Sequence, residues 1–249
     1  KDRASTNKYT GLQVSLTNAG LVGISELGLT VSGTVQVNKG PAGGARLDWS
    51  QVTGAGNELP TVTLAMDQSV ELAITNGSIA LDAFGFVVLA GTFNLVKQTN
   101  VAIDDGAGPV ATFNADVLSL SLTASGFAGV GGQLSAPNLS TATVTIATTD
   151  AIGFSIPSAT LDLVLVKDRA STNKYTGLQV SLTNAGLVGI TELGLTVSGT
   201  VQVNKGPVGK DRLDWSQVTG AGNELPTVTL VMSHNLELAA AGTVWVDLF

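Results

Sequence analysis

Few residues of this sequence could do chemistry. The chain has one histidine and no cysteine among 249 residues, which excludes thiolate metal sites, disulfides and cysteine nucleophiles. The histidine, His234, stands where the other copy of an internal repeat has Gln68. A catalytic histidine needs a positioned nucleophile and an orienting carboxylate, and the sequence supplies neither. We therefore expect His234 to be a solvated loop residue.

The segment Asp104-Asp105-Gly106-Ala107-Gly108 has the composition of a calcium-binding loop. It lacks the ligand spacing and the bidentate glutamate of an EF-hand, and it lacks the nonapeptide of calcium β-rolls. We interpret it as a turn, with Ca²⁺ as the one candidate cofactor. The glycine-rich segments at 40–44 and 129–132 lack the spacing and the following helix of a phosphate loop.

Trp49 and Trp215 lie in the same hexapeptide, Arg-Leu-Asp-Trp-Ser-Gln. An exposed tryptophan there could stack on a sugar ring, but packing over the end of a sheet is the better interpretation. Asn76-Gly-Ser and Asn138-Leu-Ser match the short N-glycosylation sequon. Four lysines close their units at the same place, where we expect them to keep strand ends soluble and discourage edge pairing: Lys39, Lys97, Lys167 and Lys205. The sequence assigns no catalytic, cofactor-binding or metal-binding residue, and we do not expect an enzyme.

Composition favours a structural protein. Only 12% of residues are charged, roughly half the usual ~25%. The net charge of −7 argues against nucleic acid or an anionic membrane as a partner. The longest apolar runs, such as residues 84–90, fall far short of the ~20 residues that span a bilayer. The first residues contain no apolar signal-peptide core.

An internal repeat is the strongest signal in the chain. Residues 1–66 recur at 167–232, and the copies match at 61 of 66 positions. We therefore divide the chain into a full period, 1–166, and a half period, 167–249. Three of the five differences fall at positions 42–45, in a Gly/Pro segment that we interpret as an exposed loop.

A weaker repeat lies inside the period. Residues 12–39 match residues 70–97 at Thr, Asn, Gly and Lys positions, with apolar residues alternating between them. Residues 118–132 repeat the first half of this unit, and residues 144–167 repeat a slightly shortened whole. Each period therefore contains about four related β units, which is typical of stacked repeat proteins.

Alternation of apolar with Thr, Ser or other small residues predicts strands throughout, as in Leu29–Val37 and Leu161–Val166. Turn residues divide them, and we expect turns at Thr17–Gly20, Asn76–Ser78, Lys39–Pro41 and Asp104–Gly106. The fold class is all-β. We favour an elongated β-solenoid-like stack, in which each unit is one coil; tandem β-sandwich domains are the alternative.

Both ends of the sequence cut through a repeat. It opens at the equivalent of Lys167, after the strand LDLVLV, and it closes on residues that resemble the start of the second unit. We expect open strand edges at both ends, and hence a window of a longer array or chains that join end to end.

The runs ITNGSIALDAFGFVVLAGTFNLVK, ADVLSLSLTASGFAGVGG and TGLQVSLTNAGLVGISELGLTVSGTVQVN resemble the repeats of very large bacterial surface proteins. These giant adhesin-like proteins, some with a LEPR-XLL-type N-terminal segment, hold many tandem β-rich repeats. The resemblance covers essentially the whole chain. It implies secretion, a cell-surface or extracellular location, and a role as fibre, spacer or adhesive stalk. It carries over no catalytic residues.

The leading hypothesis is therefore a structural repeat segment of an extracellular bacterial filament or giant adhesin. Its partner would be itself, end to end and laterally, with no nucleic acid and no membrane span. A second hypothesis is a surface module whose loops, Gly40–Asn57 and Gln98–Pro109, bind glycans or calcium. An enzyme on a β-solenoid is the third, and it ranks last because the acidic residues are scattered.

Overall fold

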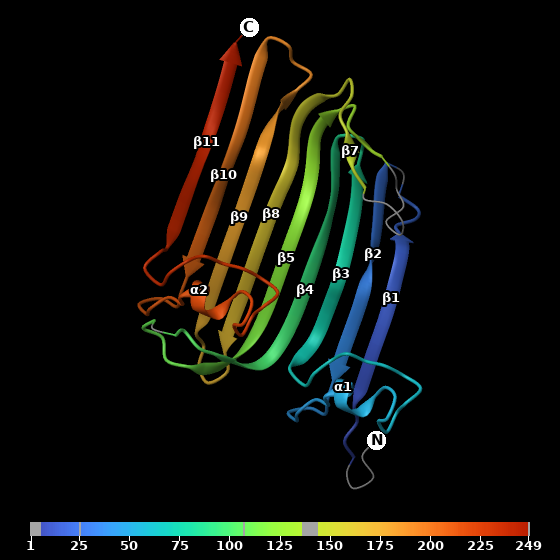
Figure 1. Ribbon diagram of the computed structural model, residues 1–249, viewed down its shortest axis with the longest axis vertical. Helices are drawn as coiled ribbons and strands as arrows, with labels where there is room; N and C mark the ends of the chain where they lie inside the picture. Colours follow the sequence, from blue (N-terminus) through green and yellow to red (C-terminus); the bar gives the residue numbers. More distant parts are fainter. Residues whose placement is uncertain (1–5, 25, 107, 136–143, 249) are drawn as a thin grey trace.

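Alternating apolar and small polar residues build one broad antiparallel sheet (Figure 1). The computed structural model describes residues 6–24, 26–106, 108–135 and 144–248. Nine long strands follow one another across the sheet: β1 (Thr10–Gly20), β2 (Leu27–Lys39), β3 (Val70–Ala83), β4 (Val87–Ile103), β5 (Phe113–Val130), β8 (Ile152–Asp168), β9 (Lys174–Val188), β10 (Leu193–Lys205) and β11 (Leu238–Leu248). Two short strands, β6 (Gln133–Leu134) and β7 (Ile146–Ala147), form a separate hairpin. The helices α1 (Trp49–Val52) and α2 (Trp215–Val218) are one turn each.

The predicted all-β class is confirmed, but the β-solenoid is wrong. Every long strand pairs antiparallel with its neighbour in chain order, apart from the β6–β7 hairpin set between β5 and β8. The units at 12–39 and 70–97 are the hairpins β1–β2 and β3–β4, and the units at 118–132 and 144–167 supply one long strand each, β5 and β8. All of them widen one open sheet, and none is a coil that closes on itself. The alternative of tandem sandwiches is not observed either, since the described chain contains one large sheet and one two-stranded sheet.

Two expected turns are β-bulges inside long strands. Asn18 in β1 and Asn76 in β3 both have φ 51°, in the left-handed region, and the pairing register shifts beside each. The backbone N–H of Asn18 donates to Ser32 Oγ at 2.9 Å, and that of Asn76 donates to Asn94 Oδ1 at 3.0 Å. Asparagine tolerates this conformation, so it marks a bulge here and a turn elsewhere. The other two predicted turns, at Lys39–Pro41 and Asp104–Gly106, do follow the ends of β2 and β4.

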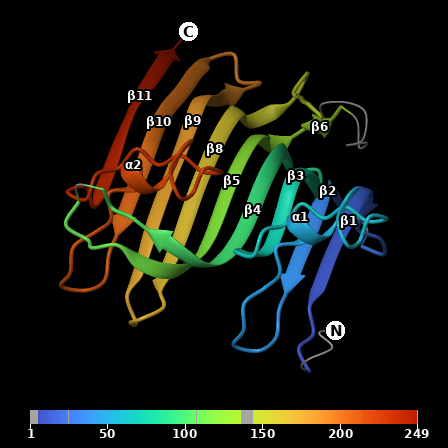
Figure 2. The ribbon, with the colours of Figure 1, turned by 60° about the horizontal axis from the view of Figure 1, so that its bottom comes forward.

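One face of the sheet carries the covering segments. Residues 40–69, here called the first lid, contain α1, and residues 206–235, the second lid, contain α2. Figure 2 shows both helices on the same face of the sheet. The main core lies under the second lid, where side chains of β5, β8 and β9 meet those of the lid: Ala115, Val117, Val164, Val166 and Tyr175 against Leu213, Trp215, Val218, Leu225, Val228, Leu230 and Met232. A smaller cluster joins Ala80 and Ala90 to Val144, beside the β6–β7 hairpin.

The repeat in the sequence is a repeat in strand register. Val14 pairs with Val35 in the first copy, and Val180 pairs with Val201 in the second. Likewise Val37 pairs with Leu72, and Val203 with Leu238. Since β9, β10 and β11 take the places of β1, β2 and β3, the sheet gains six long strands in each period. No helix among the described residues is long and apolar enough to cross a membrane.

Candidate functional site

Each lid is fixed to the sheet by a buried tryptophan. The indole Nε1 of Trp215 donates to Asn204 Oδ1 at 2.8 Å, and Nδ2 of Asn204 donates to the carbonyl oxygens of Leu213 and Ser233 at 2.9 and 3.0 Å. The ring lies over Gly177, where an added Cβ would be 2.7 Å from Trp215 Cε2. Trp49 repeats the arrangement with Asn38 at 2.9 Å. Both tryptophans are buried, which confirms the packing interpretation and excludes sugar stacking on their faces.

The one-turn helix beside each tryptophan follows from local hydrogen bonds. Oδ1 of Asp214 accepts from the backbone N–H of Ser216 at 3.1 Å and caps α2. The hydroxyl of Thr219 donates to the carbonyl oxygen of Trp215 at 2.8 Å and ends the helix after one turn. The sequence Asp-Trp-Ser-Gln-Val-Thr therefore holds each tryptophan in one orientation.

Asp105, in the acidic segment 104–108, has a structural role. Asp105 is buried, and its carboxylate accepts from the backbone N–H groups of Val110, at 3.1 Å, and of Asp214. It thereby joins the β4–β5 connection to the second lid. The carboxylate of its neighbour Asp104 accepts from Gly106 N–H at 3.0 Å and closes the local turn. Among the described residues, no three His, Cys, Asp or Glu side chains gather in a way that could hold a metal ion.

His234 lies beside an acid but outside hydrogen-bond distance. Its Nδ1 is 4.0 Å from Asp214 Oδ2, and its side chain is partly exposed. The other oxygen of Asp214 accepts from Ser216 at the start of α2. The pair therefore lacks the tight His–carboxylate bond that orients a catalytic imidazole.

A groove of about 580 Å³ is lined by the start of the first predicted binding loop and, from the second, by Thr99. Gly40 and Pro41 of the first lid line one side, and Lys97 and Thr99 line another. Residues 98–103 belong to β4 itself, so the segment predicted as a loop at 98–109 is a strand for half its length. An equivalent groove of about 730 Å³ lies beside the second lid, at Lys205, Arg212 and Glu237.

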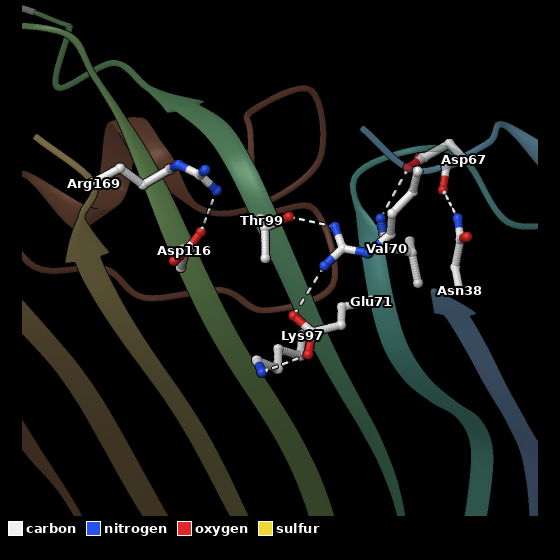
Figure 3. Close-up of polar contacts among 9 residues, drawn as sticks. Asn38, Asp67, Val70, Glu71, Lys97, Thr99, Asp116 and Arg169 are labelled. Atoms are coloured by element: carbon white, nitrogen blue, oxygen red, sulfur yellow. Dashed lines mark hydrogen bonds and ion pairs between the residues drawn. The ribbon is translucent and has the colours of Figure 1, made fainter. Parts of the chain in front are cut away.

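Ion pairs cross the strands at this groove (Figure 3). Arg46 places Nη2 3.0 Å from Glu71 Oε2 and also donates to Thr99 Oγ1, while Lys97 Nζ is 2.7 Å from Glu71 Oε1. One strand further, Arg169 contacts Asp116 at 2.9 Å. Partly exposed ion pairs contribute only about 0–1 kcal/mol each. Lys97 and Arg169 are exposed at the groove and Arg46 is largely buried, and each of these three cations already has a carboxylate partner.

The remaining predicted residues lie in strands or outside the described residues. Asn76 is exposed at its bulge in β3, and Asn138 lies outside the described residues. The four lysines lie at one end of the sheet, as expected. They belong to β2, β4, β8 and β10, which are paired on both sides, so the prediction that they guard strand edges is wrong. The edges belong to β1 and β11.

Two rows of polar side chains on the lid-bearing face were not predicted from the sequence. Strand pairing aligns seven hydroxyl side chains from β2 to β10: Ser32, Ser78, Thr92, Thr123, Thr160, Ser181 and Thr200. The neighbouring row contains Asn94, Ser121, Asp162, Gln179 and Gln202. The sequence does show Thr and Ser at alternate positions of the strands. It does not show which of these residues lie side by side, because that depends on the pairing register of every two neighbouring strands.

Asp162 and Asp168 on β8 have opposite electrostatic environments. Partial burial raises the pKa of Asp162, and a hydrogen bond from Ser121 opposes this shift. The hydroxyl of Ser171 and the backbone N–H of Ala170 lower the pKa of Asp168. Burial, with the nearby carboxylates of Asp168 and Asp105, raises the pKa of Tyr175. None of these groups contacts a nucleophile–base pair of the kind that catalysis requires.

No family model, curated protein or solved structure matches this chain.

Proposed function

We propose that this chain is a structural protein whose sheet is continued by further strands at the β1 edge, as a segment of an extracellular bacterial filament or giant adhesin. One observation carries the proposal: the two lids are nearly identical in sequence but not in burial. Leu225 and Val228 of the second lid are 1% and 2% exposed, whereas their counterparts Leu59 and Val62 in the first lid are 45% and 47% exposed.

The difference has a positional cause. The second lid follows β10 and reaches back over β9, β8 and β5, whose side chains bury it. The first lid follows β2 and reaches back over β1, beyond which the described chain supplies no strand. Strands equivalent to β8 and β5, added beyond β1, would therefore bury the exposed apolar residues of the first lid.

The exposed edge of β1 supports the same proposal. Residues 8–22 are identical to residues 174–188, which contain β9. In β9 the corresponding edge pairs with β8, from Gly153–Val188 to Lys167–Lys174. The β1 edge thus has the residues that accept a β8-type strand, and strand addition needs no new chemistry. Repeated periods joined in this way would give a fibre that grows across its strands, about 29 Å for each six.

The test is strand addition in trans. A synthetic peptide with the β8 sequence, residues 152–168, is added to the full chain, and amide hydrogen exchange is measured for β1 and the first lid. We expect slower exchange in both segments, while a scrambled peptide of the same composition leaves them unchanged. Electron microscopy should show elongated particles that the β8 peptide shortens. Discrete monomers, together with β1 amides that the peptide does not protect, would overturn the proposal.

The glycan- or calcium-binding module remains the second candidate, because the groove is lined by the first of the loops predicted to bind and by Thr99 of the second. Calcium would need ligands beyond the isolated carboxylates of the described residues. Thermal melting with Ca²⁺ and then with a chelator tests it: stabilisation that the chelator reverses favours the module over the fibre.

A further inference from the structure

The face of the sheet opposite the lids is apolar from one edge to the other. Paired residues of neighbouring antiparallel strands point to the same face. The registers align one such row across all nine long strands: Val14, Val35, Ile74, Leu95, Leu120, Leu163, Leu178, Val203 and Leu238. None of these side chains belongs to the buried clusters formed by the lid and the hairpin in the described chain.

Shape as well as polarity distinguishes this apolar face. The next row is also bulky, with Phe93, Leu122 and Leu161 on the central strands. Beside it, Gly91, Ala124 and Ala159 form a strip of small side chains on those same strands. Ridges of large residues thus alternate with a shallow trough, the relief that interdigitates when two sheets pack face to face.

We propose that a second copy of this chain covers the apolar face, so that two sheets form a sandwich. Nine strands about 4.8 Å apart and about ten residues long present roughly 1,200 Å² in each copy. A stable protein–protein interface needs about 800 Å² for each partner. The face therefore exceeds the area that a dimer requires, and a single peptide strand would cover only a small part of it.

Charged residues lie at the rim of the apolar face. The row next to the apolar row contains Lys97 and Lys205, paired with Leu118 and Thr176. Lys97 already forms an ion pair with Glu71 at 2.7 Å. The contact between the two copies therefore rests on the apolar rows rather than on this rim. A net charge of −7 for each chain disfavours an anionic lipid surface as the occupant.

This face-to-face contact is independent of strand addition at the β1 edge. Edge growth lies in the plane of the sheet and uses backbone hydrogen bonds, whereas the sandwich uses side chains perpendicular to that plane. One contact can thus fail while the other persists, and the β8 peptide reports on the edge alone.

Adjacent residues of β5 give a matched pair of variants. Leu122 lies on the apolar face, and Thr123 lies exposed in the hydroxyl row of the other face. We expect sedimentation of the wild-type chain and of Thr123→Lys to give at least twice the mass of 25.2 kDa. Leu122→Lys would bury an unpaired charge and weaken association by about 100-fold or more. It should still bind the β8 peptide.

Single cysteines give a second measurement, since the chain has none of its own. Oxidised Leu122→Cys should form covalent dimers, and Thr123→Cys should not. This pair decides the matter even if Leu122→Lys loses its fold by circular dichroism. Equal association of the two lysine variants, or equal cross-linking of the two cysteine variants, overturns the proposal. So does flotation of a monomeric wild-type chain with uncharged phosphatidylcholine vesicles, which would make lipid the occupant.

Discussion

The indole nitrogen of Trp215 donates to the side-chain oxygen of Asn204 at 2.8 Å, and Trp49 makes the same bond to Asn38 at 2.9 Å. One asparagine thus receives the tryptophan of a lid and donates to two carbonyl oxygens of that lid. The two pairs share their chemistry and differ in their surroundings, because only the second lid is backed by β5 and β8. Comparing the two pairs therefore measures what β5 and β8 contribute to the stability of a lid.

We predict that Asn204→Ala lowers the free energy of unfolding by about 3 kcal/mol. The change leaves the indole N–H and two carbonyl groups without partners in a site that water does not reach, and each unpaired buried group costs about 1–3 kcal/mol. Urea unfolding followed by far-ultraviolet circular dichroism measures the loss.

Asn38→Ala is the matched control, and it should cost no more than about half as much. Asn38 is as fully buried as Asn204, but the first lid above it leaves Leu59 and Val62 exposed, so we expect this lid to open at lower cost and admit water to the freed groups. Equal losses in the two variants would contradict the view that the lids differ in their support.

We also predict that Asp105→Ala loosens the second lid. The carboxylate accepts from Asp214 and Val110, and its loss leaves their N–H groups unpaired at a cost of about 1–3 kcal/mol. Hydrogen exchange should become faster in residues 206–235. Asp104→Ala is the control, since that carboxylate accepts from Gly106 N–H within its own exposed turn. Similar exchange in the two variants would show that Asp105 does not fix the lid.

The features that depend on local residue patterns could be predicted from the sequence. Alternation gave the strands, and the offset between copies gave the equivalence of β1 and β9. It could not predict the sheet, because a hairpin and a solenoid coil use the same alternating residues and differ only in which edges pair. The bond from Asp214 to Asp105 joins residues 109 positions apart, which no local pattern reveals. Asn76 was predicted to turn the chain, but Asn94 on the next strand accepts its N–H and keeps it in the sheet.

Two aspartates of one strand should give opposite pH dependences. The pKa of Asp168 is lowered from its ordinary value of 3.8 by the Ser171 hydroxyl and the Ala170 N–H. Its contribution is therefore present above pH 3.8 and lost as the pH falls through the lower, folded value. Asp168→Asn should reduce stability at pH 7 and have little effect at the lowest pH, as thermal melting from pH 2 to 7 would measure.

Asp162 should behave in the reverse sense. Partial burial raises its pKa above 3.8, so the folded state binds the proton more tightly than the unfolded state does. Stability then falls as the pH rises from 3.8 through the folded pKa, and it stays lower above it. Asp162→Asn should remove that fall and stabilise the chain at pH 7, by less than about 1 kcal/mol because solvent screens the group. A destabilised Asp162→Asn at neutral pH would show that hydrogen bonds to the carboxylate outweigh its burial.

The bulge at Asn184 offers a test of why asparagine recurs at this position of the repeat. Asn184 has φ 53°, and its backbone N–H donates to Ser198 Oγ at 2.8 Å. Alanine pays the steric cost of the left-handed region, about 1–2 kcal/mol, whereas glycine does not. We predict that Asn184→Ala destabilises the chain by about 1 kcal/mol more than Asn184→Gly, as measured by urea unfolding. Both variants lose the same side-chain contacts, so their difference isolates the backbone. Equal stabilities would mean that the asparagine side chain, rather than its tolerance of positive φ, maintains the bulge.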